Sequence, residues 1–84
     1  MKDDEIVKML RSAGSKGSSA VQLAELLDEL TEGGLSDAAI VTYFKRAFPG
    51  IPLRVLREAG GWSRVSSGGV SDDEFNRLIQ PWLV

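Results

Sequence analysis

The sequence predicts an all-α protein, a compact bundle of about five short helices. Three observations lead to this prediction. Apolar residues recur at three- and four-residue steps along most of the chain, which is the period of an amphipathic helix. Serines that precede acidic or amide residues mark several helix starts. Paired glycines, or a glycine beside a proline, separate the periodic segments.

Length and composition indicate one folded domain that spans 1–84. The chain has 84 residues, of which 43% are hydrophobic and 26% charged, with a formal net charge of −2. A chain of this size buries little more than about 60% of the surface that its unfolded form exposes. Most of its apolar side chains are therefore needed in the core, and little apolar surface is left for other purposes.

The first two helices are expected in the N-terminal part of the chain. Asp3 to Ala13 should form the first, with acidic residues in its first turn, where the helix dipole favours negative charge. Serine and glycine then dominate 12–19, which is expected to be a flexible connector. The second helix should begin after Ser19, which has the spacing of a capping box with Gln22. Its leucines share one side and its acidic residues the other.

Two further helices are predicted in the middle of the chain. The third should start after Ser36, an N-cap, and end at the Pro49-Gly50 pair. A short fourth helix should follow, with Pro52 at its first position. Its inward side is expected to hold Leu53, Leu56 and Ala59. These two helices, with the turn between them, could form a core that resembles a helix-turn-helix.

The last helix should begin at Ser71, where Ser-Asp-Asp-Glu has the pattern of a capping box. Its core face is expected to hold Phe75, Leu78, Ile79 and Trp82. Pro81 should bend or stop the final turn. The other tryptophan, Trp62, fits either a core position or a contact with a partner, because tryptophan is common in both places.

The residue types make catalysis and metal binding improbable as functions. The chain has neither cysteine nor histidine, which removes disulfides, thiolate sites, the commonest metal ligand and the usual general base. We expect no enzymatic activity, no cofactor and no metal. The acidic clusters 3–5 and 72–74 are interpreted as helix-start residues instead of metal ligands. The loop 14–19 is interpreted as a linker that caps a helix and not as a phosphate cradle, because it lacks the spacing of a P-loop.

No apolar run approaches the roughly 20 residues that a membrane span needs, and the first residues do not have the pattern of a signal peptide. We therefore expect no membrane partner and a cytoplasmic location.

The distribution of charge is the most informative feature for function. Residues 1–37 carry four basic and eight acidic side chains, whereas residues 38–71 carry five basic side chains and a single acidic one. The expected third and fourth helices supply four of these cations close together. A basic patch bordered by apolar residues suits an acidic protein surface or a phosphate backbone. The candidate partner-binding residues are Val41, Lys45, Arg46, Ile51, Arg54, Arg57 and Trp62.

Three functional hypotheses follow from this patch. The first is a small non-catalytic protein–protein interaction module, a regulatory adaptor, inhibitor or antiactivator that binds an acidic or mixed surface of a larger protein through this basic and apolar patch. The alternative is a helix-turn-helix DNA-binding regulator that uses the same cations. A homodimer is a third possibility, since the acidic second helix of one copy could meet the basic patch of another.

Overall fold

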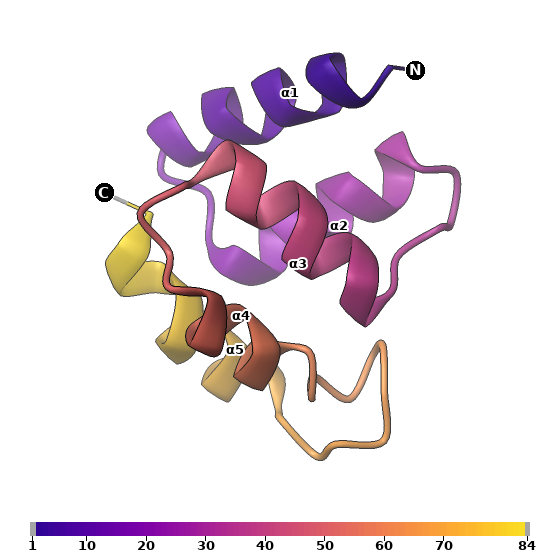
Figure 1. The fold of residues 1–84 in the computed structure, drawn as a ribbon, viewed down its shortest axis with the longest axis vertical. Coiled ribbons are helices and arrows are strands. Elements are labelled where there is room, and N and C mark those ends of the chain that lie inside the picture. Colours follow the sequence, from indigo (N-terminus) through magenta and orange to yellow (C-terminus); the bar gives the residue numbers. More distant parts are fainter. Residues whose placement is uncertain (1, 84) are drawn as a thin grey trace.

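The computed structural model describes residues 2–83, which form five α-helices and one 3-10 helix (Figure 1). In chain order they are α1 (Asp3–Ser15), α2 (Ala20–Leu30), α3 (Asp37–Ala47), α4 (Leu53–Ala59), α5 (Asp72–Ile79) and η1 (Gln80–Trp82). Among these residues the only extended pairing is an isolated parallel bridge between Trp62 and Val70. The all-α prediction is confirmed.

No helix among residues 2–83 combines the length and apolar character needed to cross a membrane.

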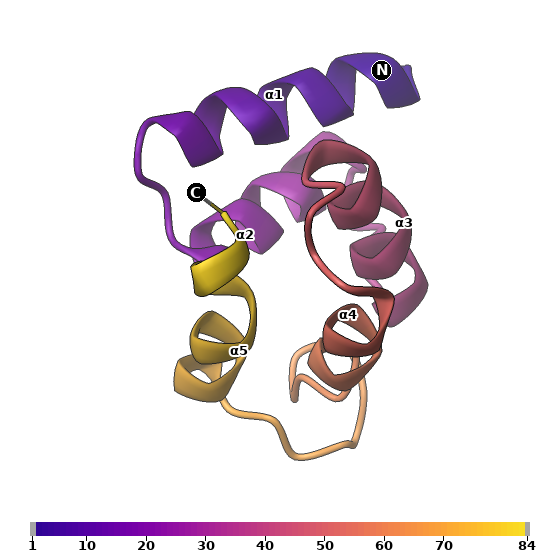
Figure 2. The ribbon, with the colours of Figure 1, turned by 60° about the vertical axis from the view of Figure 1, so that its left-hand side comes forward.

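The helices enclose the core as a closed ring of contacts. Helix α1 packs on α2 and α3, α4 packs against α3 and α5, and α5 returns to α2. In Figures 1 and 2, α1 covers one end of the molecule, while α4 and α5 form the other. The Cα radius of gyration is 11.3 Å, close to the value of about 12 Å expected for a compact chain of this length.

The core consists of apolar side chains from every α-helix and from the segments between α3 and α4 and after α4. Its largest fully buried members are Trp62, Phe44 and Phe75, and no polar or charged residue among 2–83 is buried with them. The Trp62 and Phe75 rings stack with their centroids 4.2 Å apart, and Phe44 meets the Phe75 ring edge-on at 6.3 Å. These rings join α3, α5 and the segment after α4.

Helix α1 is longer than the sequence predicts. It continues to Ser15, through residues that were expected to form the flexible connector, so the connection to α2 is only four residues long. Gly14 explains the difference, because it serves packing and does not break the helix. A Cβ atom on Gly14 would lie 2.8 Å from the ring of Phe48, so glycine lets the end of α1 approach the end of α3.

The prediction that Trp82 lies in the core is wrong, because this side chain is 39% exposed. Helix α5 ends at Ile79, and the chain continues as a 3-10 turn that contains Pro81. The tighter turn rotates Trp82 away from the stripe that Phe75 and Ile79 begin.

The irregular segment between α4 and α5 depends on a close approach of two glycines. Gly61 accepts a hydrogen bond from the Val70 N–H at 3.0 Å, and Ser63 donates to the Val70 carbonyl at 2.8 Å. A Cβ atom on Gly68 would lie 2.6 Å from the Cα atom of Gly61 and 2.8 Å from its carbonyl oxygen. Because these are backbone atoms, they cannot rotate out of the way.

We expect Gly68→Ala to lower the free energy of unfolding by about 1–3 kcal/mol, the usual cost of overpacking a tight site. Gly50→Ala is the matched control, because nothing lies within 4 Å of its Cβ position and its backbone is not left-handed. That variant should be neutral or more stable by about 0.4–1 kcal/mol. Urea unfolding followed by tryptophan fluorescence measures both. Equal stabilities of the two variants would contradict this account of the segment.

Candidate functional site

The structure separates the seven predicted contact residues into three groups. Two are buried, two are engaged in contacts within the molecule, and three remain accessible. The buried pair is Ile51 and Trp62, the engaged pair is Lys45 and Arg46, and the accessible group is Val41, Arg54 and Arg57.

The prediction that Ile51 is exposed at the turn is wrong, and Trp62 does not offer a contact surface either. Both side chains are 0% exposed. Ile51 lies in the turn between α3 and α4, but its side chain enters the core. Trp62 stacks on Phe75, and its Nε1–H donates to Asp72 Oδ1 at 2.8 Å. Both residues stabilise the fold and are removed from the candidate surface.

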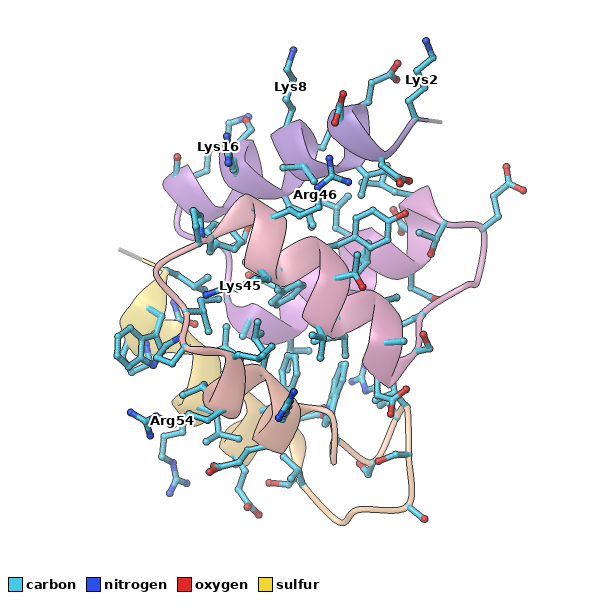
Figure 3. All side chains as sticks on the ribbon, viewed as in Figure 1. Lys2, Lys8, Lys16, Lys45, Arg46 and Arg54 are labelled. Atoms are coloured by element: carbon cyan, nitrogen blue, oxygen red, sulfur yellow. The ribbon has the colours of Figure 1, made fainter. Side chains whose placement is uncertain are left out.

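Arg46 holds α3 to the start of α1. Its guanidinium lies 2.8 Å from Asp4 Oδ1 and 3.8 Å from Asp3 Oδ2, and Figure 3 shows it between the two helices. The Tyr43 hydroxyl donates to Asp3 Oδ1 at 2.7 Å in the same group. This hydrogen bond raises the pKa of Tyr43 above its ordinary value, with smaller contributions from partial burial and from the Asp3 charge; the Arg46 charge opposes them. The acidic cluster at the start of α1 therefore already has partners within the molecule.

Lys45 stabilises the turn that follows α3. Its Nζ donates to the carbonyl of Pro49 at 3.0 Å and to that of Ile51 at 2.7 Å. No carboxylate takes part in these contacts, so the ammonium keeps an uncompensated charge. The neighbouring Arg11 acts in a similar way, since its Nε donates to the Ala47 carbonyl at the end of α3.

Arg54 and Arg57 differ from Lys45 and Arg46, because their side chains make no polar contact with another element among residues 2–83; Arg57 lies in the last turn of α4, where a cation is favourable. The ion pairs among residues 2–83 join Arg46 to α1 and Arg64 to Glu25 and Asp72. Within that part of the chain, the side chains of Arg54 and Arg57 make no hydrogen bond or ion pair, and both residues are exposed. Figure 3 shows Arg54 projecting from α4 away from the ribbon. The sequence from 38 to 57 has no acidic residue that could pair with them locally.

Two surface hollows adjoin these arginines. The α3–α4 hollow has a volume of about 540 Å³ and is lined by Val41, Leu53 and Arg57, among others. The α4–α5 hollow, also about 540 Å³, lies on the other side of Arg57 and contains Val70 and Leu78. Arg57 therefore stands where the two hollows meet.

Leu53 is a site residue that the sequence reasoning missed. It was expected to face inward, but it is 43% exposed. Val55, Leu56 and Ala59 form the buried side of α4. With these three residues buried, Leu53 faces solvent beside the α3–α4 hollow. In a helix of two turns either stripe is possible, so only the tertiary contacts decide between them.

The Ser/Gly-rich connection between α1 and α2 has no free amides with which to hold a phosphate. The N–H groups of residues 16–18 donate to carbonyls of α1. Ser19 and Gln22 form the predicted capping box. The amides of Ala20 and Val21 donate to the side chains of Gln80 and Asn76. These bonds support the interpretation of the loop as a capping linker.

The acidic clusters likewise have structural partners. Asp72 accepts from the Trp62 indole and from Arg64, and Ser71 caps α5 by accepting from the Glu74 amide. Among residues 2–83, no group of three or more acidic side chains is arranged to hold a metal ion.

A helix-turn-helix could pair α3 with α4 or α2 with α3, and these two frames place different charges on the surface. In the α3–α4 frame the recognition helix would be α4, which has seven residues, a length of about 10 Å, and which also exposes Glu58. In the α2–α3 frame, Glu25 and Glu29 are exposed on α2, where they would repel phosphates.

The fold and the site together define a small all-α protein with an arginine-bearing, partly apolar surface on α3 and α4. Comparisons with family models, with curated proteins and with solved structures find no match for this chain. The functional argument therefore rests on the site itself.

We expect Asp3→Ala to move the titration of Tyr43 to lower pH, because the substitution removes the hydrogen-bond acceptor that raises its pKa. The chain has one tyrosine, so the absorbance of tyrosinate reports this residue alone. Because the folded-state pKa lies above the unfolded value of about 10, the contact stabilises the fold below that pH. This contribution is lost as the pH rises through the folded-state pKa.

Asp73→Ala is the matched control for this titration, since Asp73 is also exposed but lies in α5. It should leave the midpoint of Tyr43 where the wild type has it. A common midpoint for all three proteins would show that the Asp3 contact is absent in solution.

Proposed function

We propose that this protein is a non-catalytic protein–protein interaction module that binds an acidic surface of a larger protein. It would act as a regulatory adaptor, inhibitor or antiactivator. The contact surface is formed by Arg54 and Arg57 together with Val41 and Leu53, and it is called the arginine surface below.

The unused charge of Arg54 and Arg57 is the observation on which this proposal depends. Arg11, Arg46 and Arg64 each bind other parts of the molecule, whereas the side chains of these two, like that of Arg77 on α5, make no such contact within residues 2–83. They lie three residues apart on α4 and share one face. An arginine fork that is free in the monomer is suited to pair with a carboxylate of a partner, and its field steers the encounter.

The apolar part of the surface supports a protein partner. Leu53 is one of only three large hydrophobic residues exposed within residues 2–83, and it adjoins the α3–α4 hollow. Burying the exposed 43% of this side chain against a partner would contribute roughly 1 kcal/mol, less than half of the gain for a fully exposed leucine. A phosphate backbone offers no comparable apolar contact, and the net charge of −2 and the exposed Glu58 oppose it.

The rest of the proposal concerns chemistry and location. A chain without histidine or cysteine lacks the side chains that most often serve as general base or nucleophile, which is why the proposed activity is binding alone. A cysteine-free chain is also suited to the reducing cytoplasm, where we propose that the partner is met.

We expect the double substitution Arg54→Glu/Arg57→Glu to abolish capture of the partner from nuclease-treated lysate of the native host. The captured protein is then identified, purified and titrated by calorimetry. Two lost arginine–carboxylate contacts, each of about 1 kcal/mol, together with the new repulsion, should weaken binding at least about tenfold.

The matched control is Lys8→Glu/Lys16→Glu, which makes the same change of charge on α1. Both lysines are exposed, and Figure 3 shows them projecting from the end of the molecule opposite Arg54. Capture by this variant should resemble that by the wild type. Equal capture by both reversed variants would reject the arginine surface. Capture that disappears with nuclease would favour the nucleic-acid alternative, and a concentration-dependent dimer that the Arg54/Arg57 variant abolishes would favour self-association.

A further inference from the structure

The two hollows beside α4 adjoin each other. Both are lined by Arg57 and by Gly61, and each has a volume of about 540 Å³, within the range of about 300–1,000 Å³ that is typical of ligand sites. Apolar side chains line both sides, with Val41 and Leu53 in the α3–α4 hollow and Leu78 in the α4–α5 hollow. The single guanidinium between them is that of Arg57.

The position that lines both hollows next to Arg57 is a glycine, Gly61. Gly61 has no side chain, and a Cβ atom there would lie 3.3 Å from both a methyl group of Val70 and the Glu58 carbonyl oxygen. Gly68, which lines the α4–α5 hollow, is in still closer contact with the Gly61 backbone. The start of the segment that follows α4 therefore contributes backbone, and no side chain, to the lining that the two hollows share with Arg57.

The charges that surround Arg57 restrict what can bind. Asp37 lines the α3–α4 hollow, and Glu58 and Glu74 line the α4–α5 hollow, where Arg77 is also present. Three carboxylates at the margins would repel a polyanion such as a run of acidic residues or a phosphate backbone. One carboxylate placed at Arg57, between the margins, would gain a charge-assisted contact at the least cost in repulsion.

We infer that the two hollows bind an extended segment of a partner protein that carries one acidic side chain between two apolar ones. The acidic side chain pairs with Arg57, and the apolar side chains enter the hollows on either side. This inference rests on the proposed function and specifies the chemistry of the partner. Within the hollows it requires a single carboxylate with apolar neighbours, while Arg54, which lines neither hollow, meets the acidic surface of the partner outside this segment.

The inference is tested by selecting displayed random peptides on the purified full-length protein. Peptides enriched on the wild type should share one Asp or Glu flanked by apolar residues. The strongest is then synthesised with its acidic residue and with the corresponding amide. We expect Arg57→Gln to weaken binding of the acidic peptide at least tenfold, and to have little effect on the amide peptide. If the Arg57→Gln substitution and the change of acid to amide do not weaken binding additively, Arg57 and the peptide carboxylate interact directly.

A second variant tests the hollow without altering any charge. Ala38 is exposed on α3 and lines the α3–α4 hollow, so Ala38→Trp should fill that space and weaken peptide binding at least tenfold. Ser12→Trp, at an exposed position of α1, is the matched control and should bind like the wild type. Circular dichroism verifies that both variants keep the helical fold.

Several outcomes would overturn the inference. They are the absence of any enriched peptide, a consensus without an acidic residue, and binding that neither Arg57→Gln nor Ala38→Trp changes. Capture of the partner from lysate by the two sets of variants distinguishes failure of this inference from failure of the proposed function. If the Arg54/Arg57 reversal abolishes its capture but Ala38→Trp does not, the arginine surface stands and the two-hollow inference falls.

Discussion

The burial of the Trp62 indole is the contact on which the α4–α5 end of the molecule depends. The chain has no cysteine, so the long irregular segment after α4 is held by non-covalent contacts. Trp62 anchors it through its stack on Phe75 and its hydrogen bond to Asp72. Arg64 completes the arrangement, since its guanidinium lies 5.1 Å from the centroid of the indole ring and pairs with both Asp72 and Glu25. The end of α4, the start of α5 and the outer side of α2 are thereby joined.

The candidate site is a consequence of this anchoring. With Trp62 inside, the segment must double back so that Gly68 lies against Gly61 and Val70 pairs beside Trp62. These residues form the wall of the α4–α5 hollow, and Gly61 joins it to the α3–α4 hollow. A residue that sequence reasoning considered for contact with a partner thus contributes indirectly, by placing the backbone that lines the α4–α5 hollow beside Arg57.

Local signals made the helices predictable, and tertiary contacts decided the rest. Ser19, Ser36 and Ser71 cap helices as expected, because a cap depends only on residues within three positions of it. Gly14 could not be interpreted correctly from its neighbours, since its role is to admit Phe48, which is distant in sequence. Ile51 illustrates the same limit, because whether a turn residue faces the core depends on which helices meet beneath it.

The site shows the same division between local and tertiary information. The excess of cations between 38 and 57 is visible in the sequence, and it is the reason that Arg54 and Arg57 were predicted as contact residues. The fold alone determines that Arg46 pairs with α1 and that Lys45 binds the carbonyls of the turn.

The residues that stay unpaired or exposed after folding are informative, because small domains have little stability to spare. Two like charges three residues apart cost about 0.2–0.5 kcal/mol, and the exposed Leu53 forgoes part of the stabilisation that burial would give. Arg57 in the last turn of α4 offsets part of this cost, because a cation is favourable there. Under the proposed function, binding to a partner is the process in which the remaining cost would be recovered.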